Sequence, residues 1–358
     1  MEPTIPGRPE RSSPTIGIRS RIVKPCRPVA ITIEAATLNE PSPEQIPQLA
    51  YATDLGAMYC TSIEGFLASE EGFAVRGDVQ LAFTSPPFPL NRRKKYGNLV
   101  GEEYLDWLGG LAKPLGDLLT DDGSLVVELG NAWEQGQPVM STLALEALLR
   151  LLRDGGFHLC QQFVVFNPAR LPSPAQWVNV ERIRVKDAYT NVWWMSRTPR
   201  PKADNRRVLT GYSGAMKKLL KRQSYNAGER PSQHNIGKTS FLKDNGGAIP
   251  PNVLRISNTV STSAYRRYCK AHGLKLHPAR MPPELVEFFI RFLTDEKDLV
   301  FDPFGGSNTT GAAAEHLGRT WLTIEPEADY IAGSRGRFAG IPLEDRERDD
   351  RRLPGRRQ

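Results

Sequence analysis

Short apolar runs alternate with amphipathic segments along most of this 358-residue chain, and this alternation restricts the folds that it can adopt. Val79–Thr84 is a continuous apolar run that ends at Ser85 and two prolines, as a buried strand does when it reaches a loop. Strands joined by crossover helices predict an α/β fold with a doubly wound, mostly parallel sheet that binds ligands at the carboxyl ends of its strands. The same pattern predicts helices at 103–119, 143–152, 283–293 and 309–317, and strands at 124–129, 162–166, 191–195, 299–301 and 320–324.

Both ends of the chain have compositions typical of disorder. Residues 1–45 contain eight prolines with little apolar periodicity, and residues 341–358 are dominated by arginine and acids. The sequence has no apolar run of about 18 residues and no secretory signal, so we expect no membrane span and a cytoplasmic location. The four widely separated cysteines indicate reduced thiols, and the absence of a Cys-x-x-Cys pair argues against a metal site.

A basic block interrupts the alternating pattern between Ser196 and Arg280. It contains 18 Lys and Arg against three acids, a net charge of +15, so the rest of the chain carries −8 of the total of +7. Frequent Gly, Pro, Asn and Ser indicate a loop-rich insert with helical spacing only at 215–222 and 264–270. Such a block suits a polyanion, because Lys and Arg near phosphates release condensed counterions. A solvated basic linker is the alternative, and charge alone does not decide between the two.

The segment LVFDPFGGSNTTGAAAE has the pattern of a strand, a tight glycine turn and a helix. Asp302 ends the strand, Gly305 and Gly306 allow the turn, and Thr309 and Thr310 are expected to cap the helix. Helix N-terminal amides then point into a ligand site. Glycine turns of this kind also occur for backbone reasons alone.

Glu325 lies 23 residues after Asp302, at the end of the next expected strand. An acid in this position accepts hydrogen bonds from the ribose hydroxyls of an adenosine ligand. The dinucleotide fingerprint Gly-x-Gly-x-x-Gly is absent, and Asp302 stands where a pyrophosphate would approach. The ligand should therefore carry a positive group and no phosphates, as S-adenosylmethionine does with its ammonium and sulfonium.

A second pattern, Ser85, Pro86, Pro87 and Phe88, follows the first strand. The prolines fix the backbone and lack amide protons, so the Pro86 carbonyl and the Ser85 hydroxyl are presented as rigid acceptors beside an aromatic ring. This combination suits the exocyclic amine of a planar base stacked on Phe88, with its nitrogen turned toward a methyl donor. A plain strand-ending Pro-Pro turn is the alternative, and the four residues taken alone favour it.

The chain resembles the β-class amino-methyltransferases of DNA in the order of two motifs, Ser-Pro-Pro-Phe and then Asp-Pro-Phe-x-Gly-Ser-x-Thr-Thr. Its serine-first loop is similar to that of the N4-cytosine subgroup. Six segments resemble the PvuII-type modification methylases of restriction-modification systems. They are TSPPFPL, KKYGNL, FNPARLPSPAQWVN, RIRVKDA, KDNGGAIPPN and HPARMP. The resemblance spans residues 82–338. It implies a Rossmann-like, S-adenosylmethionine-dependent fold with a circularly permuted motif order. The implied parts are a catalytic half at 46–195, a target-recognition region at 196–276 and a cofactor-binding half at 277–340.

The resemblance implies a role for each matching residue. Ser85, Pro86, Pro87 and Phe88 match the catalytic loop that receives a flipped cytosine. Asn308 departs from the commoner glycine, and Glu128 at a strand end also suits an ordinary solvated acid. The implied cofactor-binding residues are Asp302, Phe304, Gly305, Gly306, Ser307, Asn308, Thr309, Glu325, Glu128, and Pro278 in the enclosing segment His277–Pro282.

The basic insert is expected to contact the phosphates of duplex DNA, which positions the duplex without reading its sequence. Polar residues between 232 and 245 are candidates for reading bases, and Trp193 and Trp194 are expected in the sheet core. The expected DNA contacts are Arg197, Arg200, Arg206, Arg207, Lys217, Lys218, Lys221, Arg222, His234 and Lys238.

The resemblance implies methyl transfer from S-adenosylmethionine to the N4 amine of a cytosine flipped from double-stranded DNA, within the palindrome CAGCTG. It also implies a protein that protects DNA from a companion restriction endonuclease without binding that enzyme. Modification of hemimethylated duplex suits a monomer. Two alternatives stay open: an N6-adenine methyltransferase on the same scaffold, and a DNA-binding protein without catalysis. A covalent route through C5 of cytosine needs a cysteine nucleophile, and the only Pro-Cys pair, Pro25-Cys26, lies in the leader before every other motif.

Overall fold

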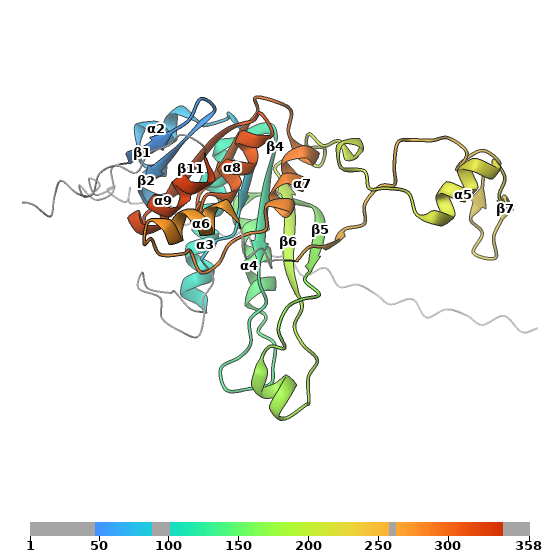
Figure 1. The fold of residues 1–358 in the computed structure, drawn as a ribbon, viewed down its shortest axis with the longest axis horizontal. Helices are drawn as coiled ribbons and strands as arrows, with labels where there is room; N and C mark the ends of the chain where they lie inside the picture. Colours follow the sequence, from blue (N-terminus) through green and yellow to red (C-terminus); the bar gives the residue numbers. More distant parts are fainter. Residues whose placement is uncertain (1–46, 88–100, 258–262, 339–358) are drawn as a thin grey trace, which may run out of the picture. The chain divides into compact units, whose positions relative to one another are not determined.

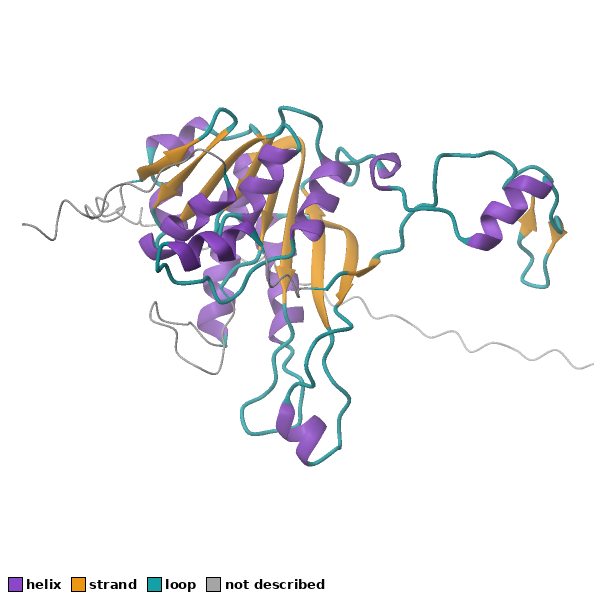
Figure 2. Cartoon of the chain, viewed as in Figure 1, coloured by secondary structure: helices purple, strands orange, loops and turns teal. Residues whose placement is uncertain are grey.

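The strands of the main sheet follow the order β1-β2-β11-β10-β3-β4-β6-β5-β9 in the computed structural model, which describes residues 47–87, 101–257 and 263–338 (Figures 1 and 2). The described strands are β1 (Gln48–Ala52), β2 (Gly56–Cys60), β3 (Val79–Thr84), β4 (Leu119–Leu129), β5 (His158–Phe166), β6 (Tyr189–Ser196), β7 (Gly228–Glu229), β8 (Asn235–Ile236), β9 (Val253–Arg255), β10 (Leu299–Asp302) and β11 (Thr320–Glu325). The described α-helices are α1 (Ile63–Leu67), α2 (Glu70–Ala74), α3 (Glu102–Leu118), α4 (Leu143–Gly155), α5 (Gly214–Arg222), α6 (Ala264–Ala271), α7 (Pro283–Leu293), α8 (Thr309–His316) and α9 (Ala328–Ser334).

Five neighbouring strands, β2, β11, β10, β3 and β4, run parallel to one another. β1 and β6 pair with their neighbours in antiparallel fashion, and β5 pairs in parallel with β9. The sheet is therefore mostly parallel, as the sequence predicts. Strands from before and after the basic block lie side by side, so the two expected halves share one sheet.

A hydrophobic core covers each face of the sheet. Leu125 and Val127 of β4 belong to the core formed with α1, α3 and α4, whereas Val126 belongs to the core formed with α7, α8 and α9. Successive side chains of a strand point to opposite faces, so a strand that is covered on both sides is apolar throughout. All six residues of β3 are accordingly buried. Trp193 and Trp194 are buried on opposite faces, as expected of core residues.

The predicted elements are confirmed, with two kinds of difference. Asp122 and Gly123, which lie between the predicted helix at 103–119 and the predicted strand at 124–129, are part of β4, where the pairing with β3 shifts register. Gly123 suits this irregular pairing because a Cβ there would lie 2.9 Å from the Val79 carbonyl oxygen. Several short elements were not identified from the sequence, because short elements carry little periodicity. They are the hairpin of β1 and β2, the helices α1, α2 and α9, and the strand β9.

The segment between residues 210 and 248 of the basic block closes on itself. Thr210 and Ala248 exchange two backbone hydrogen bonds of 2.9 and 2.8 Å, and α5 and the hairpin of β7 and β8 lie between them in the chain. Inside the segment, Tyr225 packs edge-on against Phe241 at 5.4 Å between ring centroids. This segment is therefore a small structured module and not an unstructured linker.

Candidate active site

The central strands bring the two sequence patterns to one edge of the sheet. β11, β10, β3 and β4 are adjacent and parallel, with Asp302 in register with Thr323 and Thr84 in register with Val127. Their carboxyl ends carry Glu325, Asp302, the loop that starts at Ser85, and Glu128. Parallel strands thus place chemistry from distant parts of the chain side by side, as the sheet pattern predicts.

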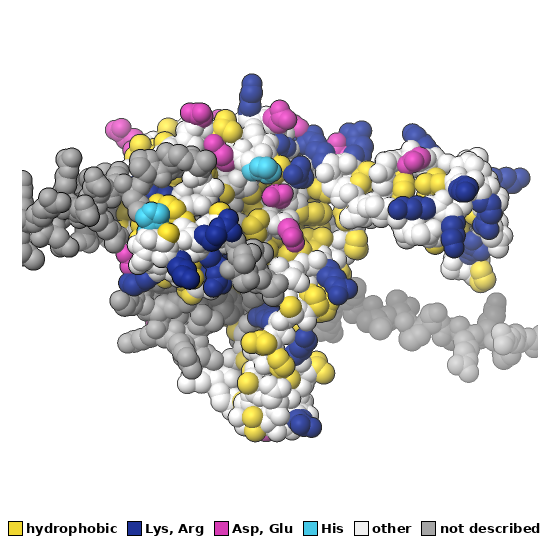
Figure 3. Space-filling view, in the orientation of Figure 1, with side chains coloured by type: hydrophobic (Ala, Val, Ile, Leu, Met, Phe, Trp, Pro, Cys, Tyr) yellow, Lys and Arg dark blue, Asp and Glu magenta, His cyan; other side chains and the backbone are white. Residues whose placement is uncertain are grey.

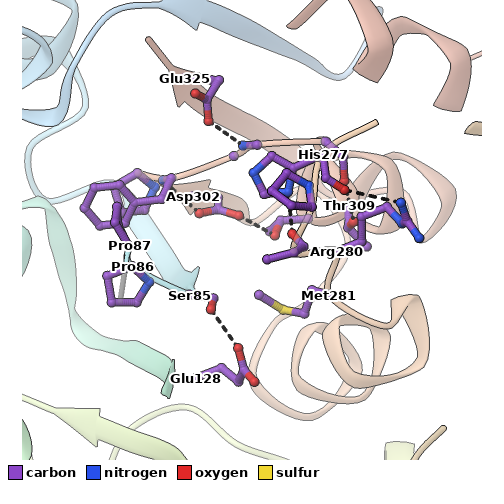
Figure 4. A pocket seen from close by; sticks show the side chains of 18 of the residues that line it. Ser85, Pro86, Pro87, Glu128, His277, Arg280, Met281, Asp302, Thr309 and Glu325 are labelled. Atoms are coloured by element: carbon purple, nitrogen blue, oxygen red, sulfur yellow. Dashed lines mark hydrogen bonds between the residues drawn. The ribbon is translucent and has the colours of Figure 1, made fainter. Parts of the chain in front are cut away.

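A cavity of about 890 Å³ opens at this edge, and both patterns line it. In Figure 4, Ser85 and Glu128 face one another at one end of the cavity, Glu325 lies at the other end, and Asp302 lies between them. Phe88 falls outside the described residues, and Asn308 is not among the lining residues. The sequence-predicted residues in the lining are Ser85, Pro86, Pro87, Glu128, Pro278, Asp302, Phe304, Gly305, Gly306, Ser307, Thr309 and Glu325.

The glycine turn folds around the Glu325 carboxylate. The Gly306 amide donates to Glu325 Oε2 at 2.9 Å, and the Glu327 amide donates to Oε1 at 3.0 Å. Gly306 has a φ of 52°, and a Cβ there would lie 3.0 Å from Nε2 of His277, so glycine fits both the conformation and the space. Burial raises the pKa of Glu325 to about 7, because the carboxylate has lost most of its water.

Asp302 braces three elements of the site. Its carboxylate accepts hydrogen bonds from the Thr84 hydroxyl at 3.0 Å, the Thr310 hydroxyl at 2.6 Å and the Phe304 amide at 3.0 Å. These donors join the end of β3 to the start of α8. Burial raises the pKa of Asp302 to about 6, against the opposing effect of these hydrogen bonds.

Asn308, and not Thr309 or Thr310, caps α8, which corrects the expectation from the sequence. Asn308 has a φ of 54°, and its side-chain oxygen accepts from the Gly311 amide at 3.0 Å. Its amide nitrogen donates to the Tyr51 hydroxyl at 3.0 Å, so the fully buried side chain is directed toward β1. Asparagine tolerates this left-handed conformation and offers both a donor and an acceptor there.

The Ser85 hydroxyl donates to Glu128 Oε2 at 2.7 Å. A hydroxyl has one proton, so this bond leaves the lone pairs of Ser85 free to accept hydrogen bonds from a ligand. Pro86 is buried beside it and lines the cavity. The family resemblance implies that Glu128 lies near the cofactor, and in the structure its carboxylate contacts the serine loop.

An aromatic wall that was not identified from the sequence lines the cavity beside Phe304 of the glycine turn. Trp107 of α3 packs against Phe304 at 5.6 Å between ring centroids and donates its indole N–H to Glu64 at 2.8 Å. Tyr104, one turn earlier on α3, also lines the cavity. Aromatic residues at helical spacing indicate core packing, so no signal in the sequence distinguished these two from core residues.

The segment His277–Pro282 lies across the turn. The His277 amide donates to the Tyr265 hydroxyl at 2.9 Å, and its carbonyl accepts from the Arg280 guanidinium at 3.2 Å. Its ring meets Tyr330 edge-on at 4.5 Å between ring centroids. Pro278, Arg280 and Met281 also line the cavity. The segment thus borders the same cavity as the glycine turn.

The expected DNA-contact residues fall into two groups. Three of the arginines have carboxylate partners. Arg197 lies 3.5 Å from Asp117, Arg206 lies 2.7 Å from Asp204, and Arg207 lies 2.6 Å from Asp295. The remaining side chains are exposed, and Figure 3 shows Lys and Arg gathered on the segment that carries α5. The exposed residues are Arg200, Lys217, Lys218, Lys221, Arg222, His234 and Lys238.

Two kinds of feature are absent from the described part of the chain. No helix within it is long and apolar enough to cross a membrane. No cluster of three or more His, Cys, Asp or Glu side chains there is arranged to hold a metal ion.

Comparisons with known proteins agree with this geometry. The profile of a DNA methylase family of N6 and N4 methyltransferases matches residues 79–335. The chain is 49% identical over 291 residues to the type II methyltransferase M.PvuII of Proteus hauseri, covering 81% of this chain and 85% of that protein. It is 23% identical over 278 residues to M.BglII of Bacillus subtilis, covering 74% and 65%.

The similarity extends to a solved structure. The PvuII DNA methyltransferase, described as cytosine-N4-specific, matches with a TM-score of 0.65 and 40% identity, covering 83% of this chain and 91% of that chain. Both patterns at the cavity lie within residues 79–335, which the family profile matches. The chain therefore belongs to the family of DNA methylases that includes the N6 and N4 methyltransferases.

Proposed function

We propose that this protein transfers a methyl group from S-adenosylmethionine to the N4 amine of a cytosine flipped out of duplex DNA. The observation that carries the proposal is the single cavity, with the Ser85–Glu128 pair at one end and the Glu325 turn at the other. Its volume of about 890 Å³ falls within the range of small-molecule sites. The relatives in the comparison, M.PvuII above all, support the same reaction.

The residues present fit S-adenosylmethionine. Glu325 and Asp302 are buried carboxylates at the cavity, which attract positive groups and hydroxyl donors and repel phosphates. Glu325 would hold the ribose hydroxyls, and Trp107 and Phe304 would cover the adenine. When bound, the cofactor supplies a methyl group on a positively charged sulfur, which an amine nitrogen can attack.

Ser85 and Pro86 would hold the target amine. Because the Ser85 proton is directed at Glu128, the serine oxygen accepts one N–H of the amine, and the Pro86 carbonyl accepts the other. Holding both protons turns the nitrogen lone pair out of the ring plane and toward the cofactor end of the cavity. Proximity and orientation of this kind contribute about 7 to 11 kcal/mol at most. The proton leaves to water once the nitrogen becomes cationic, and no covalent enzyme intermediate forms.

We propose that residues 196–276 recognise the DNA target and that the exposed basic residues of α5, Lys217, Lys218, Lys221 and Arg222, contact phosphates. Arg197, Arg206 and Arg207 are weaker candidates because carboxylates already neutralise them. Stacking on Phe88 and base reading by His234 and Lys238 stay predictions.

The finer features of the biology are also proposed. They are the target palindrome CAGCTG, a companion restriction endonuclease that acts on the same sequence, action as a monomer, and a cytoplasmic location. The 49% identity to M.PvuII supports a shared biological setting. Target sequence is the feature that a few substitutions in the insert change most easily.

One experiment tests the reaction. DNA methylated by the purified protein is digested to nucleosides, which are resolved by mass, with the Ser85→Ala variant as the control. We expect N4-methylcytosine from the wild type and none from the variant, with S-adenosylmethionine binding retained in both. N6-methyladenine would indicate the adenine enzyme on the same scaffold, and neither product would leave a DNA-binding protein without catalysis. Sequencing the methylated positions in the same sample tests CAGCTG.

A further inference from the structure

A lobe beside the cavity is not used by the function proposed above. It consists of residues 130–141, between β4 and α4, and residues 167–188, between β5 and β6, and we call it the hairpin lobe. The two segments are joined by hydrogen bonds from the side-chain amide of Asn131 to the Asp187 carboxylate at 2.9 Å and from the Arg184 guanidinium to the Pro138 carbonyl at 3.0 Å. Figure 2 shows these loops leaving the ends of the strands together.

The hairpin lobe begins at the rim of the catalytic cavity. Gly130, Asn131, Asn167, Arg170 and Thr190 lie at its base or beside it, and all five line the cavity. It leaves the sheet at the carboxyl ends of β4 and β5, the edge that carries Ser85 and Glu128. A duplex that delivers a base into the cavity must therefore pass next to this lobe.

Apolar side chains on the hairpin lobe are unusually exposed. Val185 is 87% exposed, Leu171 80% and Val180 68%, and Ile183 of the same stretch is 47% exposed. Single exposed apolar residues need no explanation, but several on one loop indicate a contact surface. Two segments that carry the family resemblance, FNPARLPSPAQWVN and RIRVKDA, lie in this lobe and contain three of these residues.

Positive charges lie among the apolar residues. Arg170 and Arg184 donate to the carbonyls of Tyr189 and Pro138, and Lys186 donates to the carbonyls of Pro168 and Arg170. Within the described residues, none of the salt bridges involves these three cations, so their charge is not neutralised. Figure 3 shows apolar and basic side chains next to one another on this part of the surface. Unpaired cations around apolar side chains suit a polyanion with a hydrophobic interior, which describes duplex DNA.

We propose that the hairpin lobe contacts the target duplex, and that Leu171 and Val185 fill the stack where the target base has left it. This inference rests on base flipping in the proposed function. Flipping breaks stacking and pairing, and apolar side chains inserted between bases replace part of what is lost. Arg184 and Lys186 then hold the phosphates on either side of the gap. The lobe would thus drive flipping, while the basic insert recognises the sequence.

The test compares the wild type with the double variant Leu171→Ser/Val185→Ser. The control, Leu145→Ser/Leu149→Ser, changes two α4 residues that are 55% and 45% exposed. Each protein is titrated with two duplexes of one sequence, selected from a random pool for tight binding to the wild type. One duplex has the target cytosine paired, and the other has it opposite a pyrene nucleotide, whose large ring fills the stack and holds the cytosine out of it.

The lobe variant should bind the paired duplex about 10-fold more weakly than the wild type. It should bind the pyrene duplex as well as the wild type does, because the pyrene already occupies the gap. The control should bind both as the wild type does, and thermal unfolding should be the same for all three proteins. Equal binding of the paired duplex by variant and wild type would overturn the inference, and so would an equal loss on both duplexes. The titration measures binding and does not require methylation. If the wild type binds DNA but forms no methylated base, the proposed function is wrong, and the binding comparison still tests the hairpin lobe.

Discussion

At the scale of single residues, one hydrogen bond determines what Ser85 offers to a ligand. Its hydroxyl donates to Glu128 at 2.7 Å, so the carboxylate orients the serine oxygen as an acceptor. A serine without this partner would be free to rotate and donate to solvent. Glu128 is therefore a positioning residue in our proposal, in addition to the place near the cofactor that the family resemblance implies.

Replacing Glu128 with Gln should lower kcat about 10- to 100-fold, because a hydrogen bond to a charged group is worth about 1.5 to 3 kcal/mol. Affinity for S-adenosylmethionine should stay at the wild-type value, because the bond lies at the other end of the cavity. Single-turnover kinetics and calorimetric cofactor titration measure the two quantities. An unchanged kcat would show that Ser85 needs no orientation by Glu128.

Glu325 should make the stability of the ligand-free protein depend on pH. Its ordinary pKa of 4.5 applies to the unfolded chain, and burial raises the folded value to about 7. The folded state holds the proton more tightly, so this stabilisation is full below about pH 4.5 and is lost as the pH rises through about 7. The contribution is at most about 3 kcal/mol.

The Tm of the ligand-free wild type should therefore fall across that window, and Glu325→Gln should flatten the fall. Asp302 contributes in the same direction, because burial raises its pKa from 3.8 to about 6. Differential scanning fluorimetry across the pH range measures both effects. Parallel pH profiles for wild type and variant would contradict the prediction.

At the scale of elements, Asp302 ties β3, β10 and α8 together. Thr310 donates to its carboxylate at 2.6 Å from the first turn of α8. Thr310→Val keeps the shape and removes this donor, so the free energy of unfolding should fall by about 1 to 3 kcal/mol. Urea denaturation measures it, with Thr320→Val as the control. The Thr320 hydroxyl bonds to a backbone carbonyl in an exposed setting, and its loss should change stability little.

The helix α5 should supply part of the salt dependence of DNA binding. Changing its four exposed basic residues to Gln should reduce the slope of log affinity against log salt by about 0.9 for each phosphate contact removed. The kcat at saturating DNA should not change, because these side chains hold no reacting group. Binding titrations over a range of salt concentrations measure the slope. The changed residues are Lys217, Lys218, Lys221 and Arg222, and the control changes Arg76, Lys113 and Arg153.

At the scale of the whole molecule, the module between Thr210 and Ala248 is separable from the catalytic sheet. The two residues exchange hydrogen bonds of 2.9 and 2.8 Å, so a short Gly-Ser linker can replace residues 211–247 without separating the chain on either side. We expect the shortened protein to fold and bind S-adenosylmethionine normally, and to lose at least about 1,000-fold in specific DNA affinity. Thermal unfolding, cofactor titration and DNA titration test this together. Retained specificity would place recognition elsewhere in the chain.

The elements with regular periodicity could be predicted from the sequence, and so could the two patterns that meet at the site. The apolar run of β3 and the amphipathic spacing of α7 indicate the same structure in isolation as in the fold. The cap of α8 could not be assigned, because Asn308, Thr309 and Thr310 are all residues that cap helices. Only the pairing of Asn308 with Tyr51, 257 positions earlier, distinguishes them.

The sequence by itself determined the strands and helices with regular periodicity, the Pro-Pro turn after Ser85 and the glycine turn, because each depends on residues close together in the chain. The tertiary structure alone decided that Glu128 orients Ser85, that Asp302 braces Thr84 against Thr310, and that Trp107 walls the cavity. These contacts join segments whose approach depends on the order of strands in the sheet. A carboxylate has no fixed role until folding sets its neighbours and removes its water.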